Sequence, residues 1–387
     1  MKIESVPFFR MKFTRSEIDA VTRTIKSGWL TTGNISHQLE DKFCRYVEAR
    51  YGAAVGSCTA GLHLALKVLG LSRGDEVITT PYTFVASTEA ILHCGARPVF
   101  ADIDPVTLNI DPNRIEEKIT PRTRAVVPVH IAGLPCRMEI ITRLARKHKL
   151  LIVNDSAHAI GAEFKGKKIG AYGDLSSFSF YATKNLTTAE GGIVTTNSRK
   201  LADEIRVLSL HGMDKKAWKR YLDQGSWYYE VVSLGYKYNL ADMNAALGLA
   251  MLDRLDILQQ KRERIASWYD QALVKFDEIE LPARERDSKH AWHLYIIKLN
   301  LDKLKIGRDQ FIRELTESGV GTSVHFIPLF LQPFYKGKYG LSQKKFPIAM
   351  SAFERVISLP FYPDLRKAEV KFVADAISKI ISKHRKI

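Results

Sequence analysis

The chain has 387 residues, of which 45% are hydrophobic and 26% are charged, a composition typical of a folded globular protein and not of a disordered one. Its 58 Lys and Arg residues exceed its 42 Asp and Glu residues by 16, an excess that suits a nucleic acid, an acidic membrane surface or an anionic small molecule as partner. The sequence has no apolar run of the roughly 18 residues that a membrane helix needs, so we expect no membrane span. It has no secretory signal, so we expect a cytoplasmic protein. It also has no C-x-x-C pair, which agrees with a reducing compartment and argues against a metal site.

The first predicted element is a helix near the N-terminus. Thr14 and Glu17 stand three residues apart, the spacing of a capping box in which each side chain bonds the other residue's backbone N–H. Apolar residues then recur at helical spacing, and Gly28 is of the type that commonly ends a helix. The apolar face of this predicted helix comprises Ile18, Val21 and Ile25.

Between about residue 53 and residue 210, short apolar runs alternate with helical patterns. Runs rich in Val and Ile on that rhythm predict a mostly parallel sheet that is covered by helices. The predicted strands are 76–80, 98–102, 124–131, 150–154, 177–181 and 192–196, and the predicted helices include 62–69, 87–92 and 138–148.

The rhythm changes after Gly235. A single long helix is predicted from residue 241 to about residue 276, because apolar residues recur there at helical spacing. A strand at 293–299 and helices at 308–318 and 367–383 follow. These elements predict a second, smaller α+β domain, so that residues 1–245 would form the large domain and residues 246–387 the small one.

Three short segments carry the residues that we expect to do chemistry. Small residues at 56–61 (GSCTAG) open the helix at 62–69, and the N–H groups and positive dipole of a helix start suit a phosphate. Asp155 follows the strand at 150–154, where a carboxylate can pair with a pyridinium nitrogen. Lys184 lies just past the strand at 177–181 and can form a Schiff base. Taken singly, each segment has an ordinary alternative: a helix cap, a turn cap or a surface lysine.

Together with their surroundings, these segments resemble the sugar aminotransferases of the DegT/DnrJ/EryC1/StrS family, from about residue 7 to residue 365. The resemblance implies an α/β protein of the aspartate-aminotransferase fold, which is fold type I of the pyridoxal-phosphate enzymes, with a large domain on a mostly parallel sheet and a smaller α+β C-terminal domain. It also implies pyridoxal 5'-phosphate as cofactor. The motifs that match are 27–33 (SGWLTTG), 74–78 (GDEVI), 155–159 (DSAHA), 179–185 (SFYATKN) and 235–240 (GYKYNL).

The resemblance assigns roles to individual residues. Lys184 would hold the cofactor as a Schiff base and Asp155 would pair with its pyridinium nitrogen, and these two are the expected catalytic residues. Phe84 and His158 would contact opposite faces of the cofactor ring. The phosphate would be held by Thr59, the backbone of Ala60 and Ser179.

The segment 235–240 would reach into the active site of a neighbouring subunit, so the resemblance implies a homodimer with shared active sites. Most relatives read Gly-Tyr-Asn-Tyr-Arg where this chain reads Gly-Tyr-Lys-Tyr-Asn. Either Lys237 or Asn239 could therefore supply the contact to the neighbouring phosphate, and the sequence does not decide between them.

The implied reaction moves the amino group of L-glutamate, leaving 2-oxoglutarate, onto a nucleotide-linked keto-sugar. Residues 155–159, 235–240 and 290–294 (HAWHL) are similar to the UDP-4-amino-4-deoxy-L-arabinose aminotransferase branch. This similarity favours the C4 ketone of a UDP-sugar as the amino acceptor.

Two other functions compete with this one. A sugar dehydratase on the same fold would have His where this chain has Lys184. A basic nucleic-acid-binding protein without enzymatic activity would need a recognition motif or a dense basic run, and the sequence has neither, so we expect no nucleic-acid partner.

Two apparent motifs carry little weight as functional sites. Residues 161–168 lack the Ser or Thr of a P-loop. His290 and His293 have no further metal ligand at useful spacing.

Overall fold

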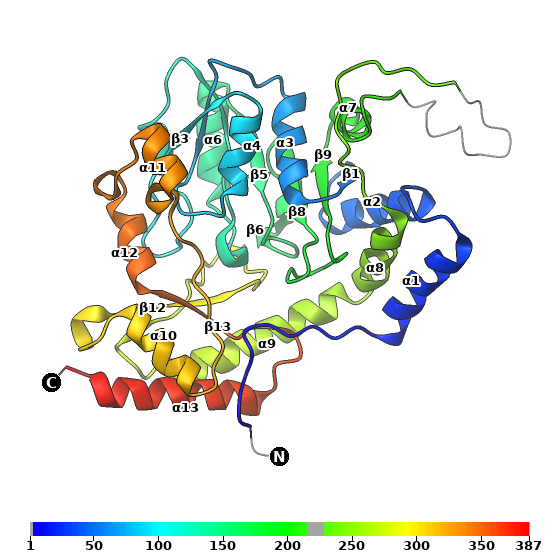
Figure 1. The fold of residues 1–387 in the computed structure, drawn as a ribbon. Helices are drawn as coiled ribbons and strands as arrows, with labels where there is room; N and C mark the ends of the chain where they lie inside the picture. The colour runs from blue at the N-terminus through cyan, green and yellow to red at the C-terminus, as the bar shows by residue number, and fades with distance from the viewer. Residues whose placement is uncertain (1–2, 215–227, 387) are drawn as a thin grey trace.

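A seven-stranded sheet forms the centre of the structure, a computed structural model that describes residues 3–214 and 228–386 (Figure 1). The strands lie in the order β1–β9–β8–β5–β4–β2–β3. The five strands from β8 to β3 are parallel, and β9 runs antiparallel to both of its neighbours, so the expected mostly parallel sheet is confirmed. The bounds are β1 Tyr51–Val55, β2 Glu76–Thr79, β3 Arg97–Phe100, β4 Thr123–Val126, β5 Leu151–Asp155, β8 Leu175–Ser179 and β9 Gly192–Thr196.

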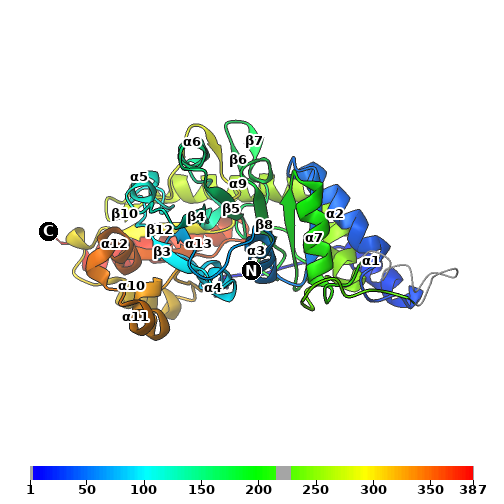
Figure 2. The ribbon, with the colours of Figure 1, turned by 90° about the horizontal axis from the view of Figure 1, so that it is seen from above.

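Helices cover both faces of this sheet, because successive buried side chains of each strand point to opposite faces. Val153 and Val194 pack with helices α3, α4 and α7 on one face. Their neighbours Ile152 and Ile193 pack on the other face, against α6 and against α2 and α8. Figure 2 shows α3 and α6 on opposite sides of the sheet. The bounds are α2 Asn34–Tyr46, α3 Cys58–Val68, α4 Ala86–His93, α6 Met138–His148, α7 Arg199–Ser209 and α8 Asp242–Leu252, and a short helix α5 spans Pro112–Glu116.

A second apolar core surrounds a three-stranded antiparallel sheet of order β10–β12–β13. Helices α9, α10 and α13 contribute to this core, and so does Val6, whose backbone makes an isolated parallel bridge with Val320. N-terminal residues are thus built into the C-terminal part. The bounds are β10 Ile279–Glu280, β12 Tyr295–Leu299, β13 Val356–Leu359, α9 Leu255–Leu273, α10 Arg308–Glu317, α11 Pro333–Tyr339, α12 Pro347–Arg355 and α13 Lys367–His384.

A third, small sheet contains the segment that superficially resembles a P-loop. Its strands β6 (Glu163–Phe164) and β7 (Lys167–Lys168) form a hairpin, and β11 (Ser288–Lys289) pairs with β6. The segment is therefore a hairpin and not a phosphate loop that opens a helix. Within the described ranges, no helix has both the length and the apolar character needed to cross a bilayer.

The long helix expected from 241 to about 276 is a wrong prediction, because the structure has two helices there, α8 and α9. The chain leaves helical geometry at Arg254, whose φ is −114° and ψ is 10°. The guanidinium of Arg254 donates hydrogen bonds of 2.6 and 3.0 Å to the two carboxylate oxygens of Glu17, which is 1% exposed. Lys42 forms an ion pair with the adjacent Asp253. Contacts to residues more than 200 positions away thus fix the break, and local spacing does not reveal them.

The N-terminal helix α1 spans Arg15–Ser27 and begins and ends as predicted. Thr14 and Glu17 form the capping box, and Gly28 ends the helix with a φ of 75°. Its apolar stripe, however, is not covered by the rest of the chain: Ile18 is 51% exposed and Ile25 is 54% exposed. This face is therefore available to another molecule.

Candidate active site

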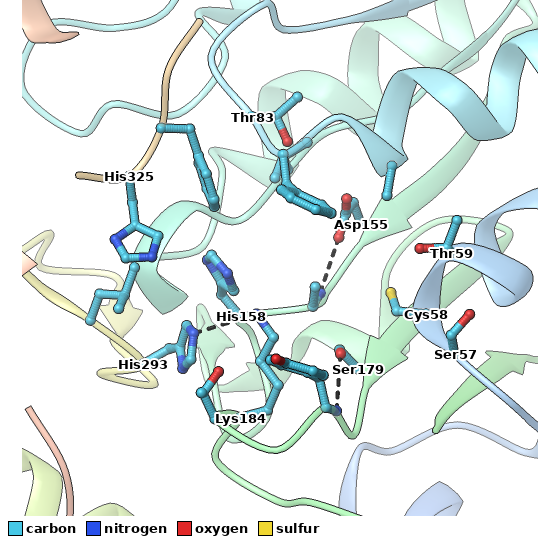
Figure 3. A pocket seen from close by; sticks show the side chains of 18 of the residues that line it. Ser57, Cys58, Thr59, Thr83, Asp155, His158, Ser179, Lys184, His293 and His325 are labelled. Carbon is cyan, nitrogen blue, oxygen red and sulfur yellow. Dashed lines mark hydrogen bonds between the residues drawn. The ribbon is translucent and has the colours of Figure 1, made fainter. Parts of the chain in front are cut away.

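A cavity of about 480 Å³ lies at the carboxyl ends of β5 and β8 (Figure 3). These strands are neighbours and parallel, so the residues at their ends meet at one edge of the sheet. The start of α3, the turn before α4, the N-terminal residues Phe8 and Phe9 and three segments from the C-terminal part also contribute to the lining. Residues from many separate stretches of sequence thus surround one space.

Asp155 is the last residue of β5, and only 5% of it is exposed. Its Oδ2 accepts a hydrogen bond of 2.6 Å from Ser87 Oγ, and its Oδ1 accepts one of 3.1 Å from the N–H of Ala157. Burial raises the pKa of the Asp155 carboxyl, while these hydrogen bonds and the charge of Lys184 act in the opposite direction. A buried carboxylate is stabilised by a cationic ligand group, so this position fits a protonated pyridine nitrogen.

Lys184 lies in the turn that follows β8, and its side chain lines the cavity (Figure 3). Its backbone N–H donates a hydrogen bond of 2.9 Å to the carbonyl oxygen of Tyr181, which holds the turn. Burial lowers the pKa of Lys184 to about 8, although the charge of Asp155 opposes this change. A lysine with this pKa has an appreciable unprotonated fraction at neutral pH and can attack a carbonyl carbon.

The N-terminus of α3 opens onto the cavity. Ser57 caps this helix, and its Oγ accepts a hydrogen bond of 3.1 Å from the N–H of Ala60. Thr59 and Ser179 line the cavity near this helix start, as the sequence predicts, whereas Ala60 is not part of the lining and its N–H bonds Ser57. The first turn of a helix attracts anions through its N–H groups and its dipole, so this end of the cavity fits a phosphate.

Two glycines allow α3 to lie this close to the sheet. A Cβ atom added to Gly61 would lie 2.4 Å from Ser177 Oγ on β8. A Cβ atom added to Gly192 would lie 2.8 Å from the backbone nitrogen of Cys58. Both distances are shorter than any ordinary contact of a Cβ atom, so these two positions set the distance between the helix start and the strand ends.

Phe84 and His158 both line the cavity. Phe84 is exposed and lies in the turn before α4, with its ring 6.2 Å from that of Phe326. His158 is buried, and its Nδ1 accepts a hydrogen bond of 3.2 Å from the N–H of Ala132. Burial, followed by the charge of Lys184, holds the pKa of His158 well below its usual range, so this imidazole is neutral at neutral pH.

The structure does not bring Lys237 or Asn239 to the cavity of their own chain. Asn239 Nδ2 donates a hydrogen bond of 2.6 Å to Thr32 Oγ1, and Lys237 is exposed. Their backbones form isolated antiparallel bridges, that of Asn239 with Val55 and that of Lys237 with Leu210. Any contact that they make with a cofactor phosphate must therefore be in another copy of the chain.

Three polar residues at or beside the cavity are not predicted as site residues from the sequence. Ser87 lies in the first turn of α4 and bonds Asp155. His293 Nε2 lies 3.4 Å from Lys184 Nζ, and His325 Nδ1 lies 2.8 Å from Ser358 Oγ. The sequence carries a signal only for His293, which belongs to the motif 290–294. The other two reach the site through tertiary contacts that no local pattern encodes.

The described residues fit pyridoxal 5'-phosphate. An anion-binding helix start, a buried carboxylate and a partly buried amine surround the same cavity, and they match the phosphate, the ring nitrogen and the aldehyde of this cofactor. Within the ranges that the structure describes, no group of three or more His, Cys, Asp or Glu side chains is placed to hold a metal ion. The mostly parallel sheet with this constellation at its strand ends defines an enzyme of fold type I, the aspartate-aminotransferase class of pyridoxal-phosphate enzymes.

Comparison with known proteins gives the family. The sequence model of the DegT/DnrJ/EryC1/StrS aminotransferase family matches residues 12–378, and the chain belongs to this family. The spore coat polysaccharide biosynthesis protein SpsC of Bacillus subtilis is 48% identical over 377 residues, which cover 97% of each chain.

Solved structures agree with this assignment. The PLP form of Spr1654 from Streptococcus pneumoniae is 34% identical and superposes with a TM-score of 0.91 over 98% of this chain and 99% of that one. PseC of Helicobacter pylori, an aminotransferase involved in the biosynthesis of pseudoaminic acid, is 30% identical with a TM-score of 0.89 over 98% and 99% of the two chains. The fold class is thereby confirmed, and the protein is a pyridoxal-phosphate-dependent sugar aminotransferase.

Proposed function

We propose that this aminotransferase moves the amino group of L-glutamate to the C4 ketone of a UDP-linked sugar. The observation that carries the proposal is that Lys184 and Asp155 line one cavity beside an anion-binding helix start. The choice of UDP and of C4 rests on the similarity of residues 155–159, 235–240 and 290–294 to the UDP-4-amino-4-deoxy-L-arabinose aminotransferase branch. The naming of SpsC for the biosynthesis of spore coat polysaccharide and of PseC for the biosynthesis of pseudoaminic acid supports a sugar substrate.

Each predicted residue has a place in this proposal. When bound, pyridoxal phosphate supplies an electron sink for the reacting carbon of the substrate. Lys184 would attach the cofactor through Nζ, the carboxylate of Asp155 would face the ring nitrogen, and Phe84 and His158 would hold the ring from its two faces. The phosphate would be bound by the first turn of α3, Thr59 and Ser179.

The chain itself moves a proton at Lys184 Nζ. As a neutral amine this nitrogen takes a proton from the substrate carbon, and as an ammonium it returns one. A pKa of about 8 makes both forms accessible near neutral pH. The aromatic side chains of Phe8, Phe326 and Phe361 line the same cavity and reduce the access of water.

Replacement of the lysine tests the assignment directly. Lys184→Ala should lack the yellow absorbance of the attached cofactor and should lose turnover, whereas Lys167→Ala, at the exposed first residue of strand β7, should retain both. A Lys184→Ala variant that turns over at the wild-type rate would contradict the assignment.

The substrate is tested separately with a panel of nucleotide sugars. Incubation with glutamate and with UDP- and dTDP-linked 3-keto- and 4-keto-sugars should yield an amino-sugar and 2-oxoglutarate, both detected by mass spectrometry. We expect product from UDP-4-keto-sugars. Product from dTDP-sugars alone, or amination only at C3, would refute the finer proposal and leave the aminotransferase assignment intact.

We also propose that the enzyme is a homodimer. Several large apolar side chains of α1, of the segment after it and of α8 are exposed, and α8 packs against α1 (Figure 1). An exposed apolar face of this kind commonly marks a protein–protein interface. The side chains concerned are Ile18, Ile25, Trp29, Leu30 and Met243.

The same dimer would share its active sites. Among the described residues that line the cavity, Lys184 is the one Lys or Arg. A second positively charged side chain would therefore be needed to balance the charge of the phosphate. Lys237 is exposed, whereas the amide of Asn239 is engaged with Thr32 in its own chain, so we favour Lys237 as the residue that binds the neighbouring phosphate.

Mixed dimers test this arrangement. Lys184→Ala and Lys237→Ala chains are each expected to be nearly inactive alone. A randomly assorted mixture should recover about one quarter of the wild-type activity, because half of its dimers carry one site with both lysines intact. No recovery, or a monomer in sedimentation analysis, would contradict shared sites. Asn239→Ala in the same assay tests the alternative, in which Asn239 binds the neighbouring phosphate.

The division into residues 1–245 and 246–387 remains a proposal about domains. It is supported by the second apolar core, whose buried residues come from 265–381 apart from Val6, with the N-terminal residues Ile3 and Phe9 packed against it. Limited proteolysis that yields a folded fragment ending near residue 245 would support the division, and cleavage confined to other places would contradict it.

A further inference from the structure

We propose that His293 holds the ε-amino group of Lys184 whenever this group is not attached to the cofactor, and thereby directs the proton that the amine carries. The proposal rests on the assignment of Lys184 as the cofactor lysine. The contact is direct, because Lys184 Nζ and His293 Nε2 lie 3.4 Å apart (Figure 3). Both side chains line the same cavity, and His293 is buried.

The backbone around His293 is fixed from several sides. Its N–H donates a hydrogen bond of 2.9 Å to the carbonyl oxygen of Ala132, and the guanidinium of Arg262 donates one of 3.0 Å to the carbonyl oxygen of Trp292. Asn185, which directly follows Lys184, donates from Nδ2 to the carbonyl oxygen of Ala291 at 2.7 Å. The turn that carries Lys184 is therefore tied to the segment that carries His293.

The charged and titratable groups around His293 keep its ring neutral. They are Lys184, His158, Arg262 and His325, and the His158 ring lies 4.3 Å from that of His293. Burial first, and then the charges of these four groups, hold the pKa of His293 well below its usual range. A neutral imidazole has one ring nitrogen without a proton, which can accept a hydrogen bond.

The geometry selects Nε2 as the ring nitrogen that serves Lys184. Among the described residues Nδ1 has no hydrogen-bond partner, whereas Nε2 faces the ammonium. An acceptor stabilises the charged form of the amine, so it raises the pKa of Lys184 against the burial that lowers it. Removing Nε2 should therefore lower the pKa of Lys184 below about 8 and release the side chain to rotate.

Three substitutions separate this role from simple packing. His293→Leu fills the space without an acceptor. His293→Gln places an amide oxygen near the position of Nε2, whereas the shorter side chain of His293→Asn reaches only the position of Nδ1. His325→Leu is the matched control, because His325 is also an imidazole at the cavity but bonds Ser358.

The first measurement uses the protein without cofactor. Lys184 is labelled with trace acetic anhydride between pH 6 and pH 10, and its acetylation is quantified by peptide mass spectrometry. The midpoint should lie near pH 8 in the wild type and His325→Leu. It should fall by about one pH unit, or tenfold in proton affinity, in His293→Leu and His293→Asn, and it should return in His293→Gln.

The second measurement is steady-state kinetics of the holoenzyme. His293→Leu should lower kcat about 10- to 100-fold with KM nearly unchanged, because a proton transfer is affected and not substrate binding. An unchanged labelling midpoint in His293→Leu would overturn the proposal, and so would equal rescue by Asn and Gln. If His293→Leu does not fold, the comparison of Gln with Asn decides. The labelling needs no cofactor, so its result is distinguishable from a failure of the lysine assignment itself.

Discussion

Ser87→Ala should change the pH range over which the protein binds pyridoxal phosphate. The substitution removes the 2.6 Å hydrogen bond from Ser87 Oγ to Asp155 Oδ2 and leaves the carboxylate with the N–H of Ala157. Hydrogen bonds to charged groups contribute about 1.5–3 kcal/mol. At 1.36 kcal/mol per pKa unit, the pKa of Asp155, which burial already raises, should rise by a further roughly 1–2 units.

The direction of the pH dependence of binding follows from competition between a proton and the cofactor ring for the same carboxylate. Binding requires ionised Asp155, so affinity falls as the pH falls through its pKa, and in Ser87→Ala this fall should begin about 1–2 pH units higher. In the pH range where affinity is falling, the variant should bind pyridoxal phosphate about 10- to 100-fold more weakly than the wild type. The assay is an absorbance titration of apoprotein with pyridoxal phosphate from pH 5 to pH 9.

A neighbouring serine provides the control for this experiment. Ser156 is equally buried, and its hydroxyl has no hydrogen-bond partner among the described residues, so Ser156→Ala should reproduce the wild-type curve. The ionisation of the cofactor phosphate is common to all three proteins and cancels in the comparison. If Ser87→Ala follows the wild-type curve within about 0.3 pH units, the hydrogen bond from Ser87 does not control the ionisation of Asp155 and the reasoning is refuted.

Two further predictions concern stability. Gly61→Ala should lower the free energy of unfolding by about 1–3 kcal/mol, because its Cβ would press on β8. Gly337→Ala is the control: it lies in α11 with no atom within 4 Å of the new Cβ, so it should leave stability unchanged or raise it by up to about 1 kcal/mol. Urea unfolding measures both variants, and equal midpoints would contradict the packing argument. Burial alone would raise the pKa of Glu40, but hydrogen bonds from His37 and Arg206 and the charge of Arg206 lower it overall, so its stabilisation is present above the ordinary carboxyl pKa and is lost as the pH falls through the lowered pKa. Glu40→Gln should therefore be about 1.5–3 kcal/mol less stable than the wild type at pH 7, and urea unfolding at pH 7 and pH 3 should show this difference shrinking in acid; a constant difference would show that the charge is not responsible.

The sequence predicted the centre of the site because that centre depends on local order. Asp155 and Lys184 each follow an apolar strand, and neighbouring parallel strands bring their ends to one edge. Ser87 escaped prediction because its role depends on a distant residue, Asp155, that no spacing reveals.

The predicted fold departs from the structure where long-range contacts override a local pattern. The helical spacing across Arg254 is genuine, yet its bonds to Glu17 end one helix and begin the next. Strand β1 was not predicted, because its sequence YGAAV has small residues in place of the Val and Ile that mark the other strands. In α1 the pattern correctly gave a helix with an apolar face, but a pattern on one chain does not say what covers that face.

The N-terminal stretch has a practical consequence for work with this protein. Val6 bridges Val320, Phe8 lines the cavity and stacks on His325 with ring centres 5.8 Å apart, and Glu17 receives the guanidinium of Arg254. Residues 6–17 therefore contact three different parts of the chain. Deleting the first 17 residues would therefore remove the bridge to Val320, open a wall of the cavity and remove the ion pair of Arg254 between α8 and α9.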